Sequence, residues 1–219
     1  MNRIFTLLLT VLIAQTGQSQ GTSNIELIYN WTDASFPASN DFGNVYNEVW
    51  GFVQDEREYA VIGTTWGTHI FDVTDPSNIY MADSIAGAFQ GGGVVHRDYH
   101  DYAGHLYMVC DEGTGQSTLQ IADLSYLPDS VHVVYDKMEP LNKAHNIFID
   151  TATGKLYVFS PKFYPTGVST LAVFNLDHPE NPVVEELYNE LGSMHDGFVR
   201  DGILFANAGM EGLFMLDVS

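Results

Sequence analysis

The chain repeats one pattern four times, and this repeat constrains its fold more than any other feature. Each copy is a short apolar strand, a glycine-containing hairpin and a second strand that closes on Asp or Asn and an aliphatic residue. The copies are Glu58–Val73, Gly104–Leu124, Gly154–Leu176 and Gly202–Ser219. Their closing residues are Asp72, Asp123, Asn175 and Asp217, which follow one another at intervals of 51, 52 and 42 residues. A period of roughly 40–50 residues built from strands predicts a β-propeller.

Each repeat extends to a blade of up to four antiparallel strands, rich in the aliphatic and aromatic residues that half-buried sheets favour. The expected strands, in order, are Glu48–Val53, Glu58–Gly63, Thr68–Val73 and Ile79–Ser84; Val94–Tyr99, His105–Cys110, Thr118–Leu124 and Val131–Tyr135; His145–Asp150, Lys155–Ser160, Thr170–Leu176 and Val183–Leu187; and His195–Arg200, Ile203–Asn207 and Gly212–Val218. The closing Asp and Asn residues are expected to accept hydrogen bonds from turn amides. The predicted fold is an all-β propeller of four-stranded antiparallel blades, of which about three and a half are present.

The chain stops at Ser219 after a third strand, where the earlier copies continue to a turn and a fourth strand. Ile25–Trp31 is expected to form a lone strand, of the kind that completes the last blade of many propellers and removes its exposed edge. We therefore expect the sequence to be the N-terminal fragment of a ring of six to eight blades. Residues 22–219 would form one incomplete propeller domain, and a surface anchor would follow in the missing C-terminal region.

The N-terminus predicts export. Arg3 precedes the apolar stretch Ile4–Ala14, and a small polar stretch, Gln15–Gly21, follows it. This apolar stretch is too short to span a bilayer, so residues 1–20 are expected to be a secretory signal peptide, and no transmembrane segment is predicted. Cys110 is the single cysteine, so an internal disulfide is excluded, and we expect a buried, inert thiol there.

The charge of the chain excludes one class of partner. Lys and Arg number 8 against 28 Asp and Glu, which gives a formal net charge of −20. A surface this acidic repels phosphate backbones and anionic membranes, so nucleic-acid binding is not expected. The acidic residues are scattered through loops and strand ends, as in an acidic globular protein.

Histidines recur at the start of the first strand of three blades. The three motifs are His96-Arg97-Asp98-Tyr99, His145-Asn146-Ile147-Phe148 and His195-Asp196-Gly197-Phe198. The first strand of a propeller blade lines the central channel, so these residues are expected at one mouth of that channel, with Trp50 near the channel face of the first blade. The candidate rim residues are His96, Asp98, His145, His195, Asp196 and Trp50.

Two interpretations of this rim remain open. It is a ligand or metal site, because neutral imidazole is a common metal donor, or it is a set of structural ties in which each histidine bonds a backbone group of its neighbour. Metal–nitrogen bonds are about 2.0–2.1 Å long, and equivalent positions in a wide ring should diverge, so structural ties are favoured and no metal or cofactor is assigned. The acidic pair Asp111 and Glu112 is expected to be a solvated turn rather than a weak cation site.

The sequence resembles a known family over Tyr46–Ser219. The segments VYNEVWGFVQDEREYAVIGTTWGTHIFDVTDPSN, VVHRDYHDYAGHLYMVCDEG, STLQIADLSYLPDSV, KAHNIFIDTATGKLYV and MHDGFVRDGILFAN are similar to choice-of-anchor B proteins, which are related to LVIVD-repeat propellers. The resemblance implies an exported β-propeller whose C-terminal segment attaches it to the cell surface. His145 and His195 match motif histidines of that family, and His96 fills a more variable position. The family implies no activity, so no catalytic residue is carried over.

Three functions are consistent with these observations. The first is a secreted or cell-surface module that binds a protein, peptide or glycan through its channel mouth or its loops, as rigid scaffolds commonly do. The second is a hydrolase or lyase at the channel mouth that uses His96, His145, His195 and Asp98. The third is a structural module of a matrix or an adhesion surface.

Overall fold

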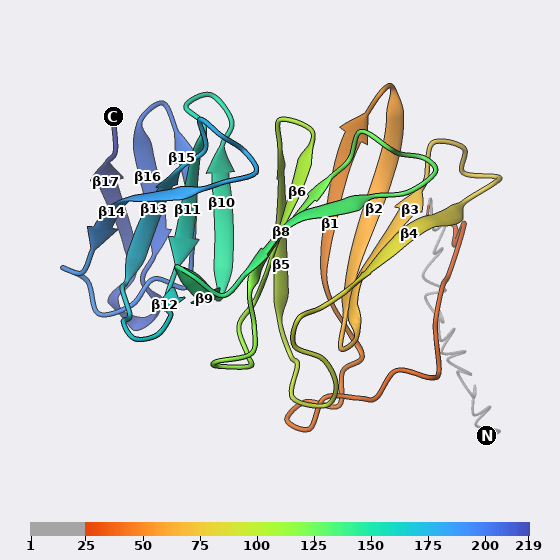
Figure 1. Cartoon of the computed structure of the whole chain (residues 1–219), viewed down its shortest axis with the longest axis horizontal. Coiled ribbons are helices and arrows are strands. Elements are labelled where there is room, and N and C mark those ends of the chain that lie inside the picture. Colours follow the sequence, from red (N-terminus) through yellow and green to blue (C-terminus); the bar gives the residue numbers. More distant parts are fainter. Residues whose placement is uncertain (1–24) are drawn as a thin grey trace, which may run out of the picture. The chain divides into compact units, whose positions relative to one another are not determined.

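The computed structural model describes residues 25–219 (Figure 1). The predicted signal peptide lies outside this part of the chain. Trp31–Ser219 form one compact unit. The strand expected at Ile25–Trp31 is wrong, because these residues have irregular backbone structure. Alternating apolar residues are compatible with an extended segment, but a strand also requires a hydrogen-bond ladder, which a sequence pattern does not specify.

The first two blades are four-stranded antiparallel sheets in which strands follow one another in chain order. Strands β1 to β4 of the first blade are Tyr46–Gln54, Arg57–Thr64, Gly67–Asp72 and Tyr80–Ala86. Strands β5 to β8 of the second blade are Arg97–Tyr102, His105–Cys110, Leu119–Asp123 and His132–Lys137. All eight strands were expected within a few residues of these bounds.

The third blade is also four-stranded, and the fourth has three strands. The third blade consists of β10, β11, β13 and β14, at Asn146–Asp150, Lys155–Phe159, Leu171–Asn175 and Val183–Tyr188. A small separate ladder pairs β9, Leu141–Lys143, with β12, Lys162–Phe163. The fourth blade consists of β15, β16 and β17, at Asp196–Arg200, Ile203–Asn207 and Leu213–Asp217, with the short 3₁₀ helix η1, Gly209–Glu211, between the last two.

Consecutive blades pack face to face, and their first strands, β1, β5, β10 and β15, contact one another in series. Three apolar clusters of the described residues fill the spaces between the blades. Their central residues are Val61, Ile70, Leu106 and Met108 between the first two blades, Tyr107, Ile121, Ile149 and Leu156 between the next two, and Phe159, Leu171, Val199 and Leu204 between the last two. Each such side chain contributes about 1.5–3 kcal/mol by burial. This arrangement confirms the predicted fold class.

The closing Asp and Asn residues perform the predicted role. In every blade the side-chain Oδ1 accepts the backbone N–H two residues further on, which holds the turn after the third strand. The four hydrogen bonds are Asp72 to Thr74 at 3.1 Å, Asp123 to Ser125 at 2.8 Å, Asn175 to Asp177 at 2.7 Å and Asp217 to Ser219 at 3.1 Å. The closing residue of each copy thus marks a repeated turn, made by a short polar side chain that bonds nearby backbone.

The first strand of the second blade begins later than expected. Val94–Tyr99 was predicted, but β5 starts at Arg97. The backbone amides of Val95 and His96 donate to Oε2 of Glu112, at 3.0 and 3.1 Å, and not to the neighbouring strand. A side-chain carboxylate therefore replaces the first part of the expected ladder.

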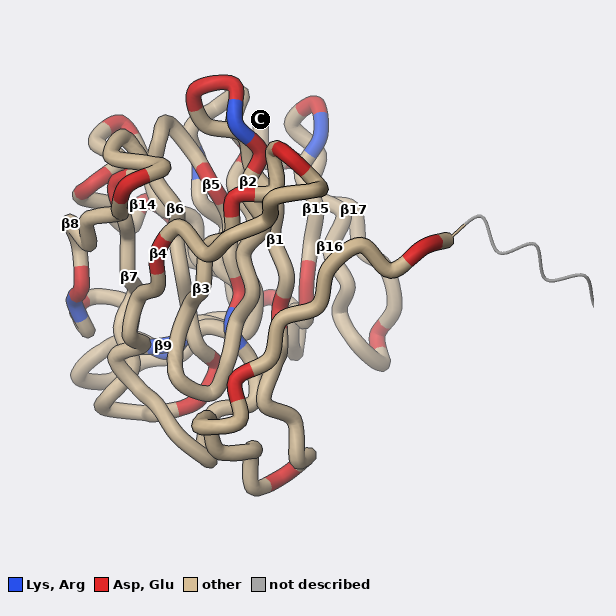
Figure 2. Tube along the Cα trace, turned by 90° about the vertical axis from the view of Figure 1, so that its right-hand side faces the viewer, with Lys and Arg blue, Asp and Glu red and all other residues tan. Residues whose placement is uncertain are grey.

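Acidic residues are spread over the whole trace, whereas basic residues are few (Figure 2). This distribution agrees with the scattered charge pattern of the sequence. In the described part of the chain, no helix has the length and apolar character that crossing a membrane requires.

Candidate functional site

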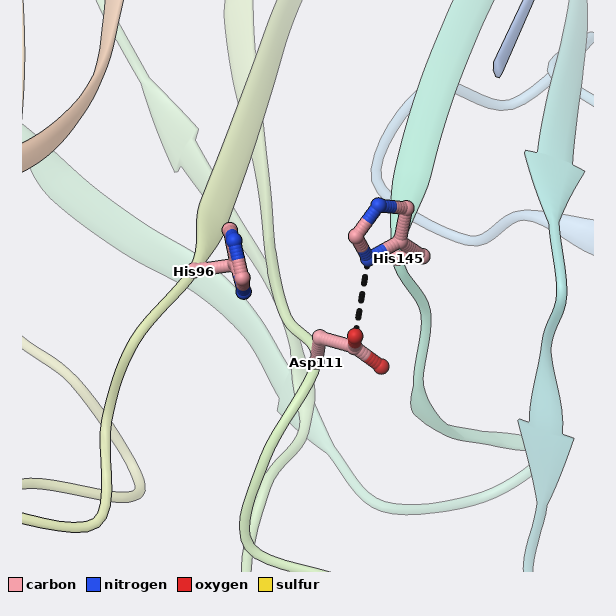
Figure 3. A group of neighbouring side chains, drawn as sticks. All are labelled: His96, Asp111 and His145. Carbon is pink, nitrogen blue, oxygen red and sulfur yellow. Dashed lines mark hydrogen bonds and ion pairs between the residues drawn. The ribbon is translucent and has the colours of Figure 1, made fainter. Parts of the chain in front are cut away.

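His145 forms the centre of a polar cluster at the end of the blades where β5, β10 and β15 begin. Its Nδ1 lies 2.8 Å from Oδ2 of Asp111, and its Nε2 lies 2.9 Å from Nε2 of His195. Because a carboxylate only accepts, Nδ1 of His145 carries the hydrogen of the first contact (Figure 3). Neutral His145 therefore presents an Nε2 lone pair toward His195.

His96 extends the cluster on the side of the second blade. Its ring centroid lies 5.3 Å from that of His145, and its Nδ1 lies 3.4 Å from Oε1 of Glu112. Each of His96, Asp111 and His145 offers one potential ligand atom, and these atoms lie within 4.8 Å of one another (Figure 3). The cluster thus combines imidazoles from three blades with carboxylates from the loop after β6.

His145 and Asp111 shift each other's pKa in opposite directions. The hydrogen bond to Asp111 raises the pKa of His145 above its ordinary value, against the opposing effect of burial. Burial alone would raise the pKa of Asp111, but the hydrogen bond from His145 and the positive charges of His145 and Lys143 outweigh it and lower that pKa. The Nζ of Lys143 lies 3.8 Å from Oδ1 of Asp111 and also donates to its backbone carbonyl.

This geometry corrects two expectations about the histidines. Equivalent positions were expected to diverge across the channel, yet the Nε2 atoms of His145 and His195 are 2.9 Å apart. The ring nitrogens were expected to bond backbone groups, but those of His96 and His145 contact side chains. The histidines are therefore joined by contacts between side chains, and His96 and His195 are exposed.

Strand register also corrects the alignment of the three motifs. In the second, third and fourth blades, the second-strand residues opposite the closing Asp or Asn are His105, Lys155 and Ile203. Four residues further on, the partners on the first strand are Asp98, Asn146 and Asp196. Arg97, and not His96, is therefore the equivalent of His145 and His195. His96 reaches the cluster from one position earlier, because Glu112 holds its backbone outside the strand.

Asp98 is an inter-blade tie and not part of the exposed cluster. Its Oδ2 accepts the backbone N–H of Ile147 at 2.6 Å, which connects β5 to β10, and the residue is buried. Burial raises the pKa of Asp98 to about 7, and the charges of Glu48 and Asp196 act in the same direction. Asp196 is exposed, and its Oδ1 accepts the N–H of Gly197 at 2.7 Å.

Trp50 belongs to a row of aromatic rings along the first strands. The row consists of Trp50, His100, Phe148 and Phe198, at equivalent register positions, with successive centroid distances of 4.5, 5.3 and 5.1 Å. The indole Nε1 of Trp50 donates to Oδ1 of Asp101 at 2.9 Å. Trp50 therefore ties the first two blades together, and it is not part of the histidine cluster.

The structure adds Asp111 and Glu112 to the candidate site. Oε2 of Glu112 accepts from the amides of Val95 and His96 and contacts Sγ of Cys110 at 3.6 Å, so this carboxylate organises the loop before β5. The sequence shows these two acids directly after an apolar strand. Apart from Cys110, the partners of these two carboxylates lie 16 or more residues away, so only the fold identifies the two acids as part of the cluster.

A surface pocket of about 300 Å³ opens beside His96 between the first two blades. Its lining includes Phe42, Asn44, Asn47, Glu48 and His96. Phe42 is 75% exposed, and the Nδ2 of Asn47 is buried without a hydrogen-bond partner among the described residues. The pocket therefore combines an exposed aromatic face with amide and carboxylate groups.

Comparisons with known proteins give little further guidance. No family model matches the chain, and no curated protein matches it. Among solved structures, the chain is similar to a GH43 β-1,3-galactosidase crystallised with galactodeoxynojirimycin, at 14% identity and a TM-score of 0.36. That match covers 65% of this chain and 46% of the galactosidase, so the chain spans less than half of its length.

Proposed function

We propose that this chain is an exported propeller of the choice-of-anchor B type that binds a glycan in the pocket beside His96. The observation that carries the proposal is the pocket lined by Phe42, Asn47, Glu48 and His96. An aromatic face packs against the apolar C–H face of a sugar ring. Amide and carboxylate groups donate to and accept from its hydroxyls. Concave sites with a few convergent polar groups are typical of small-ligand recognition.

Binding is favoured over hydrolysis or elimination by the state of Asp98. An acid or base catalyst must come within hydrogen-bond reach of the substrate. The Asp98 carboxylate is buried and already accepts the amide of Ile147, so it serves the packing of two blades. The enzyme hypothesis therefore loses Asp98 from its set of residues, whereas the exposed pocket needs no reactive group.

The test is binding of the purified protein to an array of immobilised oligosaccharides, with a peptide array in parallel. We expect a defined set of glycans to bind, and Phe42→Ala to weaken that binding at least tenfold. Tyr164→Ala is the matched control, because Tyr164 is also an exposed aromatic residue but lies outside this pocket. Export is tested separately by N-terminal sequencing of the secreted protein.

The outcomes distinguish an error in the location of the site from an error in the class of ligand. Binding to peptides alone, again lost in Phe42→Ala, would place the site correctly and replace glycan by peptide. Glycan binding that Phe42→Ala leaves unchanged would overturn the assignment of the pocket. Absence of binding to both arrays would overturn the proposed function and favour a structural module.

A further inference from the structure

We propose that His145 and His195 bind a divalent late first-row transition metal through their Nε2 atoms, with Asp111 as the positioning residue of His145. This metal site goes beyond the glycan pocket and does not depend on it. It rests on the geometry of two imidazoles from adjacent blades.

The two rings are arranged as ligands of one ion would be. Two nitrogens each about 2.05 Å from an ion and at a right angle to each other are about 2.9 Å apart. Their ring centroids would then be about 4.5 Å apart. The observed distances are 2.9 Å between the Nε2 atoms and 4.3 Å between the centroids, with an interplanar angle of 66°. A collinear N–H···N contact would separate the centroids further, so the two lone pairs converge beside the line that joins the nitrogens.

Asp111 gives His145 the orientation that metal-bound histidines commonly have. A ligating histidine usually donates its other N–H to a carboxylate or carbonyl, which fixes the tautomer and the direction of the ring. The Nδ1 of His145 does so toward Asp111 at 2.8 Å, and Lys143 in turn holds Asp111. The His145 Nε2 lone pair is therefore directed outward before any ion binds.

His96 can supply a further donor. Its Nδ1 faces Glu112, as that of His145 faces Asp111, and its side chain is exposed beside His145. The side chain of His195 is also exposed, so small rotamer changes bring either ring to an ion. Water would occupy the remaining coordination positions, which face the surface.

The donor set favours one class of metal. Imidazole suits nickel, copper, iron and zinc, whereas magnesium and calcium require oxygen ligands. A right angle between two donors fits octahedral or tetragonal coordination, and tetrahedral zinc would require the two nitrogens to separate to about 3.3 Å. Nickel and copper therefore fit the observed spacing best.

The test uses the tag-free purified protein after chelation and dialysis. Titration with Ni²⁺ is followed by calorimetry and elemental analysis, and we expect one ion per protein and no response to Mg²⁺. His145→Ala and His195→Ala should each abolish the saturable site, and His178→Ala, which removes an exposed histidine elsewhere, should not. Asp111→Asn should weaken binding about 10- to 100-fold, as expected for loss of an orienting carboxylate.

Cu²⁺ electron paramagnetic resonance provides a readout that a folding defect would not imitate. The wild type should show hyperfine coupling to at least two nitrogens, Asp111→Asn should show the same number, and this signal should be absent from His195→Ala. Circular dichroism and thermal melting of each metal-free variant confirm that it is folded. Binding that survives in His145→Ala, or that disappears equally in His178→Ala, would overturn the proposal. Neither result alters the Phe42→Ala glycan test, so the two proposals fail independently.

Discussion

His69 should make the propeller unstable in mild acid. The ring is 3% exposed and packs among Trp31, Phe36 and Trp66, with centroid distances of 4.7, 5.3 and 5.5 Å. Its Nε2 contacts Oγ1 of Thr64 at 3.2 Å, and its Nδ1 is buried without a hydrogen-bond partner among the described residues. This aromatic cage accepts a neutral imidazole and excludes the hydration that a charged one needs.

The direction of the pH effect follows from the shift in pKa. Burial lowers the pKa of His69 to about 4, with an opposing effect from Asp33 and a reinforcing one from Arg97. In the unfolded chain the ordinary value is about 6.5, so the unfolded state binds a proton first as pH falls. His69 therefore costs no stability above about pH 7, and stability is lost progressively between pH 6.5 and 4. Linkage gives about 2 kcal/mol at pH 5 relative to pH 7.5.

The assay is urea unfolding at pH 5 and pH 7.5, for the wild type and for His69→Gln, whose side chain does not titrate. With a slope of about 2 kcal/mol per molar urea, the acid shift of the wild-type midpoint should exceed that of the variant by about 1 M. Comparing shifts cancels the other titrating groups, including Asp72 and Asp111, whose lowered pKa values also cause loss of stability in acid. His178→Gln, at an exposed position, should behave as the wild type. Equal shifts in wild type and His69→Gln would refute the reasoning.

Three further predictions concern stability. Asp98→Asn keeps an acceptor for the amide of Ile147 and removes a carboxyl whose pKa is raised to about 7. A carboxyl with a raised pKa lowers the stability of the folded protein as pH rises from about 4 to 7. The variant should therefore be about 2–4 kcal/mol more stable than the wild type at pH 8 and little different at pH 4, measured by denaturant melts at both values. Gly63→Ala places a Cβ 2.8 Å from the hydroxyl of Tyr99 and against Asn47, so it should cost about 1–3 kcal/mol, whereas Gly51→Ala, whose nearest contact is 3.7 Å, should cost less than 1 kcal/mol in the same melts. Asp72→Ala removes the acceptor of the Thr74 amide and the partner of Arg57, and should lower the free energy of unfolding by about 1–2 kcal/mol, with the equivalent Asp217→Ala, which has no such ion pair, costing less.

The sequence predicts the blades well because the information for them is local. A strand, a hairpin and a closing Asp lie within about twenty residues, and alternation of apolar residues identifies the buried faces. Ile203–Asn207 and His105–Cys110 have the expected bounds for this reason. At Ile25–Trp31, the same alternation of apolar residues does not show whether the segment pairs with a neighbouring strand. Local pattern determines the blade, and pairing determines whether an extended segment joins it.

The candidate site was predicted less well because it depends on how blades are set against one another. Three histidines at intervals of about fifty residues indicate a shared end of the propeller. They do not indicate that the rings of His145 and His195 meet or that Asp98 points into the packing between blades. These outcomes depend on the direction of each side chain from the first strand, which alternates with every residue. An error of one residue, as between His96 and Arg97, therefore reverses the side to which a residue points.

The late start of β5 and the omission of Glu112 from the predicted site have a single physical cause. Val94–His96 has the composition of a strand, but its amides at Val95 and His96 bond to the carboxylate of Glu112. His96 thus lies one residue before β5, and its ring lies near that of His145. The histidine that the second blade contributes to the cluster therefore lies just outside the sheet, with its amide bonded to Glu112, and a strand pattern read from the sequence does not show this.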